Sequence, residues 1–201
     1  MSARSIAFYS ALVAASFGIA MAPAVTRSIH QRALIRRALA TGLALGDSAH
    51  HPQAVEFADY ECPACRAADS ALVAAQSRAH GLPALRFHFL PLEGIHPFAF
   101  EAAVAAVCAA QQGRFESIHH LLFQQQPELG HQSWGALAMA AGVPDTVQLT
   151  RCMDDTAAAD RVIADERLAA DLHLPGTPSF LVDGRVILGP LPDSVIRRLT
   201  R

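Results

Sequence analysis

Apolar and polar positions alternate with different periods along the chain, and the periods separate strands from helices. Residues 54–58 are apolar except for Glu56 and predict a short buried strand, and residues 85–90 alternate apolar and polar side chains and predict a second strand. A helix is expected between them, from Cys62 to about His80, where Gly81-Leu82-Pro83 would end it. The order predicts a β-α-β unit whose two strands are parallel.

A helical block follows the second strand. From residue 97 to residue 172 the pattern is helical and is interrupted at glycines and prolines, which predicts five helices. Residues 179–182 and 185–188 then predict a hairpin, because Asp183-Gly184 between them is a pair typical of tight turns. A last helix is expected from Leu191, so the predicted order is β-α-β, helical block, β-β-α.

The beginning of the chain is apolar and uncharged. No charged residue occurs from Ser5 to Thr26, a length sufficient to cross a hydrocarbon core of roughly 30 Å. Arg4 precedes this run, and Ala22-Pro23-Ala24 has the small residues of a cleavage site. We expect residues 1–26 to be a signal anchor or a cleaved signal peptide, and a buried core helix is the alternative.

Residues 27–46 are expected to form a basic helix or linker beside the membrane. Ile35, Leu39 and Leu43 recur at helical spacing and make a narrow apolar stripe. The arginines that follow the apolar run outnumber the one before it, so the positive-inside rule alone would place the folded part in the cytoplasm. The redox chemistry of the motif Cys62-Pro63-Ala64-Cys65 instead favours the extracytoplasmic side of the membrane. The folded part is expected to begin in the polar, turn-rich stretch that starts at Gly46.

Charge and cysteine content narrow the function further. From Asp47 onward 11 arginines face 18 acidic residues, and no basic stripe is present, which argues against nucleic acid as a partner. Four cysteines are too few for a scaffold that depends on disulfides, although an even number fits an oxidising compartment.

The motif Cys62-Pro63-Ala64-Cys65 lies where the first strand passes into a helix. The N-terminus of a helix favours an anion, so the pKa of the Cys62 thiol should fall below its free value of about 8.5. Pro63 suits the first helical position, which needs no N–H partner. Cys65 lies one turn deeper, where it can resolve a mixed disulfide formed at Cys62. We therefore expect a redox-active disulfide and no other cofactor.

Two other interpretations of the motif are a zinc half-site and a purely structural disulfide. Zinc needs a second close pair of ligands, but Cys108 and Cys152 are far apart in sequence, and His119 and His120 are adjacent rather than helically spaced. A disulfide that closes so short a loop restricts the unfolded chain little. No metal is expected.

Residues 55–65, residues 106–115 and Gly176-Thr177-Pro178-Ser179-Phe180 together resemble the DsbA-like family of thiol–disulfide oxidoreductases. The resemblance covers about residues 46–201 and implies an α/β thioredoxin-like fold with a helical insertion. It divides the chain into the anchor or signal segment 1–26, the linker 27–46, a β-α-β part 47–96, the insertion 97–172 and a closing β-β-α part 173–201.

The resemblance also implies roles for individual residues. Thr177-Pro178 is similar to the cis-proline loop that faces the active cysteines, where the Thr177 backbone would pair with substrate; an ordinary turn is the alternative. Glu56 matches a buried acid that exchanges a proton with Cys65, unless it is a surface residue at a strand edge. Cys108 and Cys152 resemble a pair that forms a structural disulfide, and the alternative is two buried thiols.

The expected activity is disulfide exchange with cysteine-containing proteins of the periplasm or another extracytoplasmic space. We expect a monomeric oxidase that contacts substrate through Pro63, Ala64, Thr177 and Pro178 and is recycled by a membrane redox partner. Many DsbA-like proteins have histidine where this chain has Ala64, which points to a less oxidising potential. A peptide-binding module with a vestigial cysteine pair, and a reductase dedicated to cytochrome or metal-centre assembly, are the alternatives.

Overall fold

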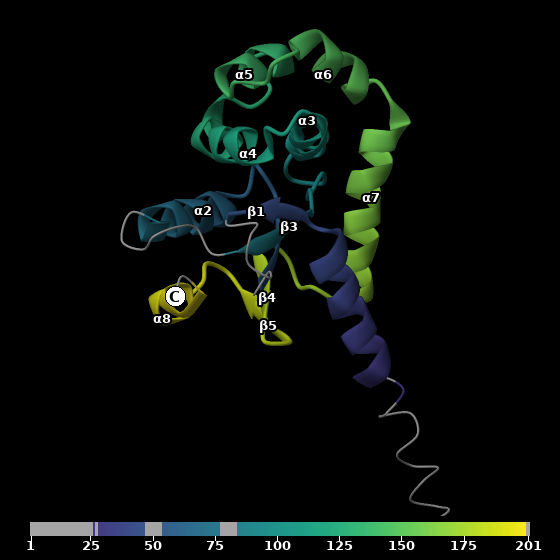
Figure 1. The fold of residues 1–201 in the computed structure, drawn as a ribbon, viewed down its shortest axis with the longest axis vertical. Coiled ribbons are helices and arrows are strands. Elements are labelled where there is room, and N and C mark those ends of the chain that lie inside the picture. Colours follow the sequence, from purple (N-terminus) through teal and green to yellow (C-terminus); the bar gives the residue numbers. More distant parts are fainter. Residues whose placement is uncertain (1–25, 27, 47–53, 77–83, 200–201) are drawn as a thin grey trace, which may run out of the picture.

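The computed structural model describes residue 26 and residues 28–46, 54–76 and 84–199 (Figure 1). The expected anchor or signal segment lies outside these residues except for Thr26, as do the turn at 47–53 and the expected helix break at 81–83. Among the helices that are described, none combines the length and the apolar character needed to cross a membrane.

A five-stranded sheet forms the centre of the fold. Its spatial order is β1 (Leu43–Leu45), β3 (Leu85–Phe89), β2 (Ala54–Ala58), β4 (Ser179–Val182) and β5 (Arg185–Leu188). β2 and β3 are parallel, as the β-α-β unit predicts, and the other neighbouring pairs are antiparallel. Every residue of β2 is buried, the four apolar residues and the central Glu56 alike.

The two faces of β2 pack against different helices. Ala54 and Ala58 belong to a core cluster shared with α2 (Pro63–Gln76) and α8 (Asp193–Leu199). Val55 and Phe57 instead pack with residues of α7 (Thr156–Asp171). Because side chains alternate along a strand, Glu56 points to the face on which α2 lies.

The helical block between β3 and β4 contains the five expected helices. They are α3 (Ala99–Gln111), α4 (Phe115–Gln124), α5 (Trp134–Ala140), α6 (Thr146–Met153) and α7, with the short 3₁₀ helix η1 (Gln126–Glu128) after α4. Figure 1 shows α3 to α6 gathered at one end of the sheet, and α7 running back along its side to the strand that follows. The block is therefore an insertion that leaves and rejoins the sheet.

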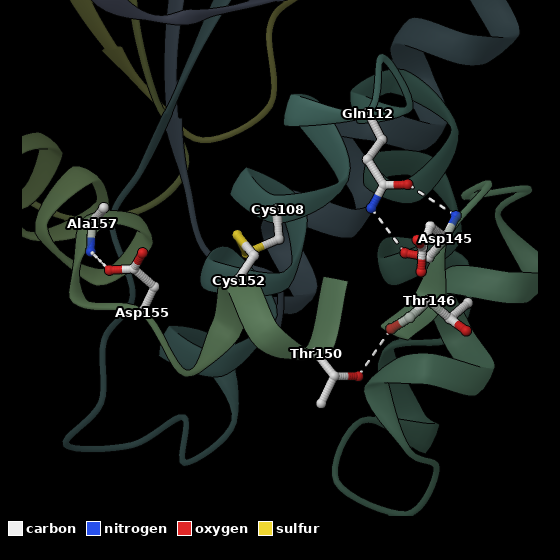
Figure 2. The surroundings of a disulfide bond; sticks show 8 residues. All are labelled: Cys108, Gln112, Asp145, Thr146, Thr150, Cys152, Asp155 and Ala157. Carbon is white, nitrogen blue, oxygen red and sulfur yellow. Dashed lines mark hydrogen bonds between the residues drawn. A yellow bond between two sulfur atoms is a disulfide. The ribbon is translucent and has the colours of Figure 1, made fainter. Parts of the chain in front are cut away.

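Cys108 of α3 and Cys152 of α6 form a disulfide that joins two helices of the insertion (Figure 2). Their Cα atoms are 5.8 Å apart and the cysteines are separated by 44 residues. Close by, the Gln112 amide donates to the Asp145 carbonyl at 2.9 Å and accepts from the Asp145 N–H at 3.0 Å. Two separate connections therefore hold the start of α6 and its end against α3.

The segment expected to be a linker is part of the folded molecule. Residues 28–41 are helical, but Leu43–Leu45 form β1 and pair with β3, so the fold begins before Gly46. Leu34 and Ala38 of this N-terminal helix are buried in the cluster that also contains Val55 and Phe57. A three-residue strand has too few positions to show an alternating pattern, which is why the sequence alone does not separate β1 from the preceding helix.

The hairpin of β4 and β5 turns at Asp183-Gly184, as predicted. Asp183 has φ 50° and Gly184 has φ 75°, the positive values that the tightest hairpin turn requires. β4 is buried throughout and pairs with β2, whereas β5 lies at the edge of the sheet and is largely exposed. The loop before β4, with Thr177 and Pro178, is thereby fixed at the end of a central strand.

Candidate active site

Cys62 and Cys65 lie where β2 passes into α2, and both are free thiols. The Cys62 carbonyl accepts from the N–H groups of Cys65 and Arg66, each at 3.1 Å, which closes the first turn of α2. Pro63, the first helical residue, is exposed and Ala64 is partly buried, so both flank the Cys62 thiol toward solvent. Cys65 is fully buried, one turn deeper.

The pKa of the Cys62 thiol is lowered to about 5. The largest contribution is a hydrogen bond from the Cys65 thiol, which stabilises the Cys62 thiolate. Burial opposes this effect, and the Thr177 side chain and the N–H groups of Cys65 and Ala64 add to it. Cys62 is consequently a thiolate at neutral pH in the reduced protein.

The neighbouring Cys65 thiol has the opposite character. Burial raises its pKa far above the ordinary value, and its hydrogen bond to Cys62 raises it further. A thiolate at Cys65 would lie in an apolar core that includes Ala68 and Leu72. The pair is therefore asymmetric, with a thiolate at Cys62, of which 7% is exposed, and a protonated thiol at the fully buried Cys65.

Glu56 is buried on the face of β2 beside α2, with 1% of its surface exposed. Burial of the carboxyl, with a smaller contribution from the charge of Asp69, raises the pKa of Glu56 to about 8. Oε1 of Glu56 has no hydrogen-bond partner among the described residues. The Glu56 charge in turn raises the pKa of Cys65, so the two groups influence each other's proton affinity.

Thr177 and Pro178 lie against the cysteines and are joined by a cis peptide bond. The Cys62 thiol donates to the Thr177 carbonyl, with an S···O distance of 3.6 Å. The Thr177 hydroxyl is buried with no other partner among the described residues, and as a donor to the Cys62 thiolate it contributes to the lowered pKa. Pro178 is buried, and its carbonyl accepts from the Gly189 N–H at 2.8 Å.

The side chains of Gln126 and Asp59, to which the sequence analysis gave no role, hold the active-site turn in place. The Gln126 side-chain amide, from η1, donates to the carbonyls of Tyr60 at 2.7 Å and Cys62 at 3.1 Å. The buried Asp59 carboxylate accepts from the Leu92 N–H and from His96 Nδ1, each at 2.7 Å. Sequence reasoning missed both residues, because their partners lie 33 to 66 positions away along the chain.

A buried polar cluster lies farther along α2. Asp69, one turn after Cys65, contacts His120 Nδ1 at 2.7 Å and His119 Nε2 at 3.4 Å. His119 Nδ1 is 3.2 Å from the Tyr60 hydroxyl. In the sequence, His119 and His120 are only an adjacent pair without the spacing of helical metal ligands. The structure places a carboxylate from α2 against both of them.

Comparison with known proteins agrees with this architecture. A family model described as thioredoxin matches residues 39–199. Among solved structures, the thiol-disulfide exchange protein alpha-DsbA2 from Wolbachia pipientis is 19% identical with a TM-score of 0.69, over 86% of this chain and 95% of that one. A thioredoxin-like oxidoreductase from Silicibacter pomeroyi DSS-3 is 27% identical with a TM-score of 0.56, over 81% and 87%.

Curated relatives match over part of their length. The Na(+)/H(+) antiporter NhaA 3 of Salinispora tropica is 35% identical over 138 residues, which is 68% of this chain and 21% of the antiporter. NhaA 1 of Mycolicibacterium gilvum is 37% identical over 151 residues, which is 72% of this chain and 24% of the antiporter. This chain thus spans a fifth to a quarter of the length of these relatives.

The resemblance to DsbA-like proteins that the motifs indicated is confirmed in the fold. The sheet, the helical insertion, the cysteine pair at the start of α2 and the cis-proline loop occur together in one chain. Since the family model covers most of the sequence, the chain belongs to the thioredoxin family.

Proposed function

We propose that this chain is a thiol–disulfide oxidoreductase that oxidises cysteine pairs in proteins outside the cytoplasm. The observation that carries the proposal is the asymmetry of its two thiols, with the pKa of Cys62 lowered to about 5 and that of Cys65 raised. A low pKa at Cys62 stabilises the reduced enzyme, and this makes the disulfide form the stronger oxidant.

The oxidase reaction begins with the Cys62–Cys65 disulfide. A substrate thiolate attacks Sγ of Cys62, the bond to Cys65 breaks, and a mixed disulfide joins the substrate to Cys62. A second substrate thiolate attacks the substrate's own sulfur, and Cys62 leaves as a thiolate. Two electrons have then passed from the substrate to the cysteine pair, and the substrate carries the disulfide.

Cys65 and Glu56, both buried, transfer the proton that this exchange requires. Cys65 has a raised pKa, so it must take up a proton as it leaves Cys62. Glu56, with a pKa of about 8, holds a proton at neutral pH and supplies it to Cys65, then regains one from solvent. The Thr177 backbone, beside Cys62, is placed to pair with an extended substrate peptide.

The location of the reaction is inferred from three features. Residues 5–26 are uncharged and apolar, as in a signal peptide or signal anchor that attaches the protein to a membrane. The disulfide between Cys108 and Cys152 is of a kind that persists in oxidising compartments. A structural neighbour from Salmonella enterica is a periplasmic thioredoxin-like protein. A membrane redox partner would reoxidise Cys62 and Cys65, and no other cofactor is needed.

The test combines an activity assay with a redox measurement on the full chain. The protein should oxidise a reduced peptide with two cysteines, and Cys62→Ser should abolish this activity. We expect the reduction potential of the pair to lie between the value of about −270 mV for thioredoxin and that of about −120 mV for DsbA. Equal activity of wild type and Cys62→Ser would exclude the enzyme, and a potential at or below that of thioredoxin would exclude the oxidase direction.

A further inference from the structure

Asp69, His119 and His120 form a cluster, called here the Asp-His-His cluster, whose potential metal-ligand atoms all lie within 4.8 Å of one another. Asp69 comes from α2 and the histidines come from α4, 50 and 51 residues later in the sequence. Asp69 and His119 are buried, and 19% of the His120 side chain is exposed. Three groups of this chemistry converge from two helices, and none of them contacts Cys62 or takes a direct part in the proposed thiol exchange.

The protonation states suit a cation. Burial lowers the pKa of His119, so that its imidazole is neutral at pH 7. The histidine contacts outweigh the effect of burial on Asp69 and lower the pKa of its carboxyl, so that it is ionised. A neutral imidazole and a carboxylate are the forms that bind a metal ion, and binding at His120 Nδ1 displaces the hydrogen that this nitrogen shares with Asp69 at 2.7 Å.

The Tyr60 hydroxyl supports the orientation of one ligand. It contacts Nδ1 of His119 at 3.2 Å, which leaves Nε2 directed at Asp69. Metal-binding histidines generally use their second ring nitrogen in this way, and the contact fixes both the tautomer and the ring. Once Nε2 binds a cation, the remaining proton lies on Nδ1 and is donated to the Tyr60 oxygen.

We propose that the Asp-His-His cluster binds a divalent transition-metal ion such as Zn²⁺. Two imidazoles and one carboxylate with a water in the fourth position are a common tetrahedral zinc set, with bonds of about 2.0–2.2 Å. The distance of 2.7 Å between Asp69 and His120 needs to open by about half an ångström to admit the ion at those bond lengths. The sequence led us to expect no metal because it shows only the adjacent histidines, and the third ligand comes from a distant helix.

The experiment measures metal binding by the full chain with Cys62 and Cys65 oxidised, so that their thiols cannot bind the ion. Zn²⁺ is titrated calorimetrically, and Co²⁺ is titrated as a spectroscopic probe. We expect one equivalent of either ion to bind, and the Co²⁺ complex to show the visible bands of a four- or five-coordinate N/O site without a thiolate charge-transfer band. Absence of stoichiometric binding up to millimolar metal would overturn the proposal.

Two histidine variants separate this site from nonspecific binding. His120→Gln should weaken the affinity at least tenfold, because it removes the exposed ligand. His96→Gln is the matched control, since His96 also pairs with a buried aspartate at 2.7 Å and is 17% exposed, but among the described residues no third potential ligand joins that pair. The control should bind as the wild type does. Equal effects of the two changes, or none from His120→Gln in a protein shown by circular dichroism to be folded, would contradict the site.

The supporting role of Tyr60 has its own readout. Tyr60→Phe keeps the ring in the core and removes only the contact with His119 Nδ1, so we expect the affinity to fall by about 10- to 100-fold with the Co²⁺ spectrum retained. An unchanged affinity would show that the Tyr60 hydroxyl does not orient His119 for metal binding. Because binding is measured with the cysteines oxidised, failure here would leave the proposed thiol exchange untouched.

Discussion

The proton on the Cys65 thiol controls the charge of Cys62. A hydrogen bond from Cys65 is the largest cause of the lowered pKa at Cys62, so Cys65→Ala should raise the Cys62 pKa from about 5 toward its ordinary value near 8.5. Cys65→Ser keeps a hydroxyl donor and should retain a low pKa. Ultraviolet absorbance of the thiolate, followed as a function of pH, measures both. Identical titrations of the two variants would show that the donor is not the cause.

Glu56 should make the stability of the protein fall as the pH rises. The pKa of Glu56 is about 8 in the folded protein and 4.5 as a reference, so between these values the folded state holds a proton that the unfolded chain has released. Glu56→Gln removes this penalty, which amounts to about 1.4 kcal/mol per pKa unit. We expect similar stability at pH 5 and a variant more stable by a few kcal/mol at pH 8.

Urea unfolding at the two pH values measures this effect. Both proteins are compared with Cys62 and Cys65 oxidised, so that the titration of Cys62 makes no contribution. A stability difference that does not change with pH would mean that Glu56 has the same proton affinity in the folded and unfolded states.

At the level of single residues, the sequence predicted those that belong to a local motif or to a family pattern. Cys62 and Cys65 are three positions apart, and Thr177 and Pro178 are adjacent, so each pair is visible in a short window. Gln126 and Asp69 were not predicted, because a glutamine or aspartate on a helix is usually a solvated side chain. Their importance arises only when packing brings distant elements together.

The short helix η1 acts on the active site through one side chain. Gln126→Ala leaves the Tyr60 and Cys62 carbonyls without their donor, and we expect a loss of about 1–2 kcal/mol in unfolding free energy together with slower thiol exchange. Gln124→Ala is the control, because Gln124 is exposed and near in sequence, and it should change stability by less than about 0.5 kcal/mol. Denaturant unfolding and the peptide oxidation assay would measure the two effects. Equal losses in the two variants would contradict this role.

The disulfide of the insertion should stabilise the helices without tuning the site. The 44-residue separation of Cys108 and Cys152 corresponds to about 4 kcal/mol in the chain-entropy treatment, and measured losses are typically about 2–4 kcal/mol. We expect the double variant Cys108→Ala/Cys152→Ala to lose a stability of this size while the Cys62 titration stays at its wild-type midpoint. A shifted midpoint would show that the insertion transmits strain to α2.

The elements that the sequence predicted well are those with a strong period and clear ends. β2, the hairpin and the helices of the insertion have apolar patterns bounded by glycine, proline or aspartate. β1 was assigned to a helix, because Leu43 also completes a helical stripe with Ile35 and Leu39. Its pairing with β3 decides the conformation, and pairing between distant segments cannot be read from the local pattern.

Across the whole molecule, a buried charged network joins the N-terminal helix to the core. His88 of β3 contacts Asp165 of α7 at 2.6 Å and the Ala38 carbonyl at 2.8 Å, so both ring nitrogens face an acceptor. Arg161 pairs with Asp165 and donates to the Thr41 carbonyl at 2.9 Å. Three segments that are distant in sequence therefore depend on one carboxylate.

Removing that carboxylate charge should be costly. Asp165→Asn leaves Arg161 without its counter-charge and His88 without its carboxylate partner, and we expect a loss of about 3–5 kcal/mol and increased hydrogen exchange in residues 28–41. Asp160→Asn on the exposed side of the same helix should have almost no effect. The network would be unimportant for docking if the two variants exchanged hydrogen at the same rate in that helix.

Gly42, which follows the N-terminal helix, packs the chain tightly against β3. A Cβ at this position would lie 2.7 Å from both Arg86 Cβ and His88 Nε2. The backbone of Gly42 therefore lies directly against β3, and the connection between the N-terminal helix and the sheet is tightly packed. The N-terminal helix, whose Leu34 and Ala38 are buried against Val55 and Phe57 of β2, therefore moves together with the strand that leads to Cys62. Any force that reaches the chain through this helix acts on the sheet as a whole and leaves the distance between Cys62 and Cys65 unchanged.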